Sequence, residues 1–100
     1  MSLYYLQKLL YQINRDPEIR KRFEADREGV LAGYELSAEE LGAIRGPDIG
    51  LLYVLGVNGQ ILMHYAAMCG FEWNAYLEAM REGVRRHGPV RAGLYKLVED

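Results

Sequence analysis

The stretch IGLLYVLGVNGQILMHYAAMCG, from Ile49 to Gly70, decides the fold, because it is densely apolar and contains no Asp, Glu, Lys or Arg. The four residues Gly-Val-Asn-Gly at 56–59 divide it into two short apolar segments. Gly56 can end one helix in a left-handed conformation, and Asn58 can cap the next. Helices that are apolar all round are usually buried by their neighbours. We therefore predict a central pair of short helices that meet at a tight corner and form the core.

The same stretch does not predict a membrane span. The two glycines of the corner, Asn58, Gln60 and His64 lie inside it, and these residues would be costly in a bilayer. The N-terminus, Met-Ser-Leu-Tyr-Tyr-Leu, lacks a basic region and a cleavage site for export. The expectation is a cytoplasmic protein without membrane association.

Composition favours one small domain over residues 1–100, because half of the residues are apolar and one cysteine excludes an intrachain disulfide. We expect 90–100 to be a loosely packed tail. With twelve basic and fourteen acidic residues, the chain has no general attraction for nucleic acid. Eight tyrosines are a high number, and tyrosine is enriched at protein interfaces.

Amphipathic segments on both sides of the central pair are expected to cover it. One helix is predicted over 3–14, and a second follows Asp16-Pro17, a capping residue and a first-turn proline, towards Gly33. Ser37 and Glu40 fit a capping box before a short helix to about 45. The last helix is predicted over 71–86. No segment alternates like a strand, so we predict an all-α domain of about five to seven short helices and no sheet.

The last helix repeats apolar residues at three- and four-residue steps, as an amphipathic helix does: Trp73, Tyr76, Leu77, Met80 and Val84. Next to the corner, Phe71 and Trp73 could plug the core. A basic cluster follows, formed by Arg81, Arg85, Arg86, His87 and Arg91. Either these cations complement the helix dipole, or one or two of the arginines meet an acidic partner surface.

No catalytic or metal-binding set is evident. His64 and Cys69 are five residues apart, about 140° around a helix, so they diverge. A histidine on such an apolar helix is more often buried or half-buried than a ligand or an acid/base group. Cys69 lies near a helix C-terminus, which does not lower a thiol pKa, so we interpret it as a core residue.

The order of these motifs resembles the small, α-type subunit of the protocatechuate 4,5-dioxygenase family, the LigA-like domains of type II extradiol ring-cleaving dioxygenases. The resemblance covers nearly the whole chain. It rests on the residues from Asp16 to Asp26, on Leu36 to Glu40 followed by Gly46-Pro47-Asp48, on Leu55 to Asn58, on Tyr76 to Met80 and, weakly, on Gly88 to Gly93.

The resemblance implies a non-catalytic small subunit that binds a large, β-type subunit and partly covers its active site. The Fe(II) and its ligands would belong to the large subunit, so we expect no cofactor in this chain. The reaction would be the O₂-dependent cleavage of a catecholic ring. We expect the following residues to contact the partner or cover its active site: Phe71, Trp73, Tyr76, Arg81, Arg85, Tyr4 and Tyr5.

One difference from the family leaves alternatives open. Protocatechuate-type small subunits have an insertion before the last helix that brings an aromatic side chain to the partner's active site, whereas here Gly70 runs directly into Phe71. LigA-like domains also occur as recognition modules for peptide-modifying enzymes, and this is the second hypothesis. An independent enzyme that uses His64 is the third.

Overall fold

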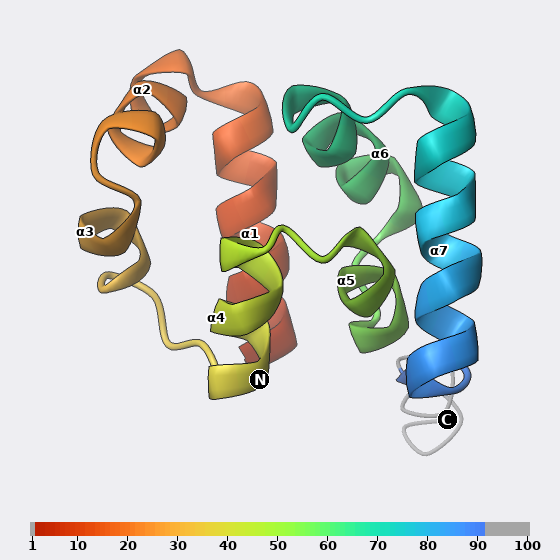
Figure 1. The fold of residues 1–100 in the computed structure, drawn as a ribbon. Helices are drawn as coiled ribbons and strands as arrows, with labels where there is room; N and C mark the ends of the chain where they lie inside the picture. The colour runs from red at the N-terminus through yellow and green to blue at the C-terminus, as the bar shows by residue number, and fades with distance from the viewer. Residues whose placement is uncertain (1, 92–100) are drawn as a thin grey trace.

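The computed structural model describes residues 2–91, and this part of the chain folds into seven helices with no strand (Figure 1). The helices are α1 (Ser2–Arg15), α2 (Pro17–Ala25), α3 (Arg27–Leu31), α4 (Ala38–Arg45), α5 (Ile49–Leu55), α6 (Gly59–Met68) and α7 (Trp73–His87). The predicted all-α fold is confirmed. From residue 92 onwards, the predicted tail lies outside the described residues.

The central pair predicted from the sequence is α5 and α6. Gly56 ends α5 with a φ of 108°, a left-handed conformation that glycine adopts without strain. The Asn58 side chain then accepts hydrogen bonds from the backbone N–H groups of Gln60, at 2.9 Å, and Ile61, at 3.2 Å. The corner therefore forms as the local sequence predicts.

The core lies where α1 and α7 enclose this pair. Figure 1 shows α5 and α6 between α1, in red, and α7, in blue, and the closest packing pairs are α1 with α6 and α5 with α7. The largest fully buried side chains come mainly from α1 and the central pair, and α4 adds Ile44: Leu6, Leu9, Leu10, Ile13, Ile44, Ile49, Leu52, Val54, Leu62 and Tyr65. Burying each large side chain contributes about 2 kcal/mol to folding.

Helix starts follow the predicted capping signals. The Asp16 carboxylate accepts the N–H of Glu18 at 2.9 Å. Ser37 and Glu40 form the complete capping box, with hydrogen bonds of 3.1 and 2.8 Å. These bonds satisfy N–H groups that have no partner within their own helix.

Two predicted helix boundaries are wrong. The helix predicted from Pro17 towards Gly33 is broken at Asp26, whose side chain accepts the N–H of Gly29 at 3.1 Å and caps a new helix, α3. The last helix begins at Trp73 rather than Phe71. In the part of the chain that the structure describes, no helix combines the length and hydrophobicity of a membrane span.

Candidate functional site

The orientation of α7 is set by glycines where it crosses α5. A Cβ atom added to Gly83 would lie 2.5 Å from the Cα atom of Gly50, and one added to Gly50 would lie 2.7 Å from the Cα atom of Gly83. Real side chains do not fit at these distances, so glycine at both positions lets the two backbones touch. The face of α7 that contains Ala79 and Gly83 therefore packs against α5.

Tyr76 lies on the same inner face of α7. Its side chain is only 5% exposed, and its hydroxyl donates a hydrogen bond to the Gly59 carbonyl at 3.2 Å. This bond ties α7 to the start of α6. Most of the Tyr76 surface is therefore used inside this chain, and little of it is available to a partner.

Because the inner face is built from Tyr76, Ala79 and Gly83, a second apolar face of α7 turns outwards. At 100° per residue, its centre lies about 90° around the helix from the buried face. We call this second face the α7 apolar stripe, and it consists of Trp73, Leu77, Met80 and Val84.

Exposure differs along the α7 apolar stripe. Trp73 is 58% exposed and Val84 is 39% exposed, whereas Leu77 and Met80 are half-buried. The apolar residues that recur along α7 are thus not all buried, and Trp73 does not plug the core as predicted. The physical reason is that small residues approach α5 more closely than the larger side chains can.

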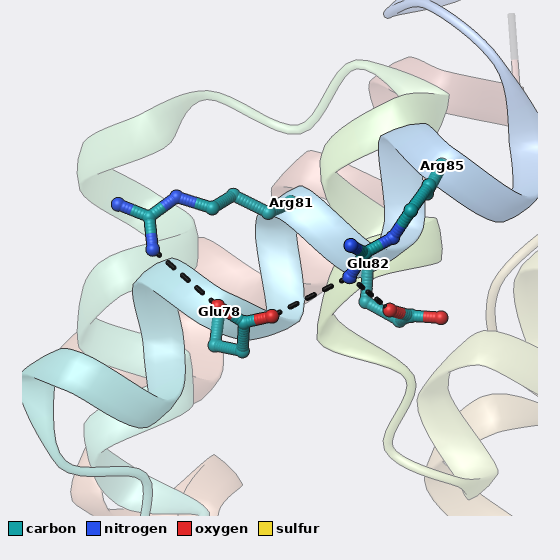
Figure 2. A network of polar contacts seen from close by, with 4 residues as sticks. All are labelled: Glu78, Arg81, Glu82 and Arg85. Carbon is teal, nitrogen blue, oxygen red and sulfur yellow. Dashed lines mark hydrogen bonds and ion pairs between the residues drawn. The ribbon is translucent and has the colours of Figure 1, made fainter.

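A network of charged side chains flanks the stripe (Figure 2). Glu78 lies 3.4 Å from both Arg81 and Arg85, and Arg85 also pairs with Glu82. The hydrogen bond to Glu82 raises the pKa of Arg85, which stays charged. Arg81 and Arg85 are mostly exposed, so both guanidinium groups remain accessible beside the stripe.

The remaining predicted contact residues lie in different surroundings. Phe71 is half-buried against the core, next to the corner between α6 and α7. Tyr4 is 61% exposed, and its ring meets the edge of the half-buried Tyr5 ring at 5.3 Å between centroids. Since α5 and α6 lie between α1 and α7 in Figure 1, the seven predicted residues form two separate groups. Their role as partner contacts stays a prediction.

The candidate catalytic groups lie in surroundings that favour no reaction. His64 is exposed on α6, so its interpretation as a buried or half-buried histidine is wrong. Cys69 is half-buried beside Tyr65, and burial raises the pKa of its thiol, which keeps it protonated at neutral pH. Among residues 2–91, no group of three or more His, Cys, Asp or Glu side chains is placed to hold a metal ion.

The predicted basic cluster is distributed over several contacts. His87 Nε2 lies 4.0 Å from an Asp48 carboxylate oxygen, and Arg91 pairs with Glu39 at 2.8 Å. These contacts join the end of α7 to the N-terminal end of α5, and Arg91, beyond α7, to the first turn of α4. Part of the basic cluster is therefore engaged in contacts within this chain.

Comparison with known proteins identifies the family. Residues 6–86, from the first turns of α1 almost to the end of α7, match the family model described as aromatic-ring-opening dioxygenase LigAB, LigA subunit. No curated protein and no solved structure matches the chain. The match covers most of the chain and confirms the resemblance inferred from the motifs. The chain therefore belongs to the LigA subunit family of aromatic-ring-opening dioxygenases.

Proposed function

We propose that this chain is the non-catalytic small subunit of a heteromeric, Fe(II)-dependent extradiol dioxygenase in the cytoplasm. It stabilises the large subunit and helps to cover the active site in which a catecholic ring is cleaved. The side chains described here do not fit an iron site, since no group of three potential ligands comes together. The proposal therefore assigns the iron to the large subunit.

The observation that supports this proposal most strongly is the partly exposed α7 apolar stripe, with Trp73 at 58% exposure, in a chain that belongs to the LigA subunit family. Tryptophan, methionine and arginine are enriched where proteins bind one another. A buried tryptophan with charged groups around it is also a common arrangement at the centre of an interface. Trp73 provides the anchor, and Arg81 and Arg85 provide a polar rim.

We assign the residues that cover the partner's active site to the corner between α6 and α7. The turn between α6 and α7 has no insertion, so the aromatic residues nearest to it are Phe71 and Trp73. Phe71 already packs against the core of this chain, whereas Trp73 is 58% exposed. Trp73 is therefore the better candidate for an aromatic group that excludes water from the partner's active site.

The experiment is a purification of the tagged chain from its native host, under anaerobic conditions and at low salt. The expected result is a stoichiometric larger partner that contains iron and cleaves a catechol. An eluate without iron, in which the chain is alone or bound to a different enzyme, would contradict the proposal. Binding to a peptide-modifying enzyme would instead support the recognition-module hypothesis.

A Trp73→Ala variant tests the surface in the same purification. Because a central interface tryptophan contributes about 2 kcal/mol or more, affinity is expected to fall about thirtyfold or more. Asn74→Ala is the matched control, because Asn74 is exposed one residue further along α7 and lies outside the stripe. If both variants recover the partner as wild type does, the assignment of α7 is wrong.

A further inference from the structure

A second surface lies between α1, α2 and α6, on elements other than the α7 apolar stripe. It is a groove of about 760 Å³. The residues that matter for its chemistry are Tyr11, Asn14, Arg15, Arg20, Ile61 and His64. We call it the α1/α6 groove. Neither the family assignment nor the proposed function gives this groove a role.

The groove has positive charge that this chain does not neutralise. Arg15 and Arg20 line it, and no Asp or Glu does. Within the described part of the chain, no carboxylate lies within 4.0 Å of either arginine. Elsewhere, by contrast, arginines of α4 and α7 pair with glutamates, as at Arg45 with Glu28. The α1/α6 groove therefore attracts carboxylates.

Arg20 is held in place before any ligand arrives. Its Nε donates to the Ile13 carbonyl at 3.3 Å, and its Nη2 donates to the Asn14 carbonyl at 3.1 Å. These bonds fix the guanidinium at the C-terminal end of α1. A cation that is already oriented loses little conformational entropy when it binds a carboxylate.

The wall that α6 contributes to the groove is mainly apolar. Ile61, Ala67 and Met68 provide it, within two turns of one helix. Asn14 donates from Nδ2 to the Ile61 carbonyl at 3.0 Å, while its Oδ1 is buried without a hydrogen-bond partner. A ligand with carboxylates and an apolar side chain would complement the arginines and this wall.

The shape of the groove favours a polypeptide over a small molecule. Tyr11, Arg15 and His64 are all exposed, so the groove is open to solvent along its rim. Small-molecule sites usually enclose most of their ligand. We propose that the α1/α6 groove binds an acidic, amphipathic segment of a partner protein. Its carboxylates contact Arg15 and Arg20, and an apolar side chain packs against Ile61 and Met68.

A peptide selection tests the chemistry of this ligand. A library of random peptides of about 12 residues is selected for binding to the immobilised full chain. Such a peptide spans about 18 Å as a helix, which is more than three helical turns. The expected result is enrichment of peptides that combine Asp or Glu with Leu, Ile or Phe. Enrichment of neutral or basic peptides would overturn the proposal.

Charge reversal then tests the place of binding. For a selected peptide labelled with fluorescein, Arg15→Glu, which reverses a charge, and His64→Glu, which introduces a negative charge, are each expected to raise the Kd about tenfold, as measured by fluorescence anisotropy. Lys21→Glu is the matched control, because Lys21 is exposed on α2 outside the groove. An equal loss in Lys21→Glu would show non-specific attraction and would overturn the proposal.

An NMR titration of the wild-type chain with the same peptide locates the contact directly. Amide shifts are expected at 11–20 and 60–68. Shifts confined to α7 would overturn the assignment to the α1/α6 groove and would leave the proposed α7 surface intact. Failure of the dioxygenase proposal would not change this result, because the titration uses no large subunit.

Discussion

Substitution of Gly83 by alanine tests how α7 is held against α5. A Cβ atom at this position would meet the backbone of Gly50, 2.5 Å from its Cα atom. Backbone atoms cannot rotate aside as a flexible side chain can, so the two helices would have to separate by about 1 Å. We expect this overpacking to cost about 3 kcal/mol.

The helix itself gains from the same substitution. Replacing a helical glycine by alanine stabilises a helix by about 1 kcal/mol. The net expectation for Gly83→Ala is therefore a loss of about 2 kcal/mol in the free energy of unfolding. Gly42→Ala is the matched control, because Gly42 lies inside α4 and an added Cβ would meet nothing within 4 Å. That variant should gain about 1 kcal/mol.

Urea denaturation followed by circular dichroism measures both variants. The two substitutions replace the same residue type within a helix, so the difference of about 3 kcal/mol between them isolates the contact between α5 and α7. If Gly83→Ala stabilises the chain as much as Gly42→Ala does, the close packing is wrong. The outward orientation of the α7 apolar stripe would then lose its explanation.

Three further predictions concern other parts of the fold. Ser37→Ala removes one half of the capping box with Glu40 and should cost about 1 kcal/mol in urea denaturation; an unchanged midpoint would contradict this. Because burial raises the pKa of Cys69, this thiol should react with Ellman's reagent at pH 8 more slowly in the folded chain than in urea, and equal rates would refute it. The hydrogen bond from Arg45 lowers the pKa of Glu28 in the folded state. The ionised Glu28 therefore stabilises the fold at pH values above its pKa in the unfolded chain, and this stabilisation is lost as the pH falls through its pKa in the folded chain. Arg45→Gln should raise the Glu28 pKa in an NMR titration, and an unchanged value would exclude the pair as the cause.

The features that the sequence predicted correctly depend on residues close together in the chain. The caps at Asp16 and Ser37 and the corner at Gly56 and Asn58 all use hydrogen bonds to nearby backbone groups. Such bonds depend on residue type and spacing, which the sequence shows. The break at Asp26 belongs to the same class, but its capping signal lies within a run of charged residues.

The buried face of α7 was harder to predict, because it depends on a contact between distant residues. Hydrophobic spacing places Trp73 and Val84 in one series with Tyr76 and does not show which of the three is buried. Gly50 of α5 determines which of the two apolar faces of α7 is buried. The backbone of α7 approaches Gly50 closely at Ala79 and Gly83, where α7 has small residues. Small residues have little weight in a hydrophobic pattern, although they decide this packing.

The α1/α6 groove could not be predicted for a related reason. Arg15, Arg20 and His64 come from three helices, and only the fold brings them together. In the sequence, Arg20 belongs to a mixed run of charges that is typical of a solvent-exposed surface. Its hydrogen bonds to the end of α1 show that it is held in a fixed position instead.

The central proposal, that this chain assists a catalytic large subunit, is tested most directly by reconstitution. The large subunit that co-purifies with this chain would be separated from it, loaded with Fe(II) under anaerobic conditions, and assayed for O₂-dependent catechol cleavage with and without the small chain. The proposal predicts that adding the chain raises the activity of the large subunit, that Trp73→Ala gives a smaller increase, and that the chain alone is inactive. Equal activity of the large subunit with and without the chain, or ring cleavage by the chain alone, would contradict it.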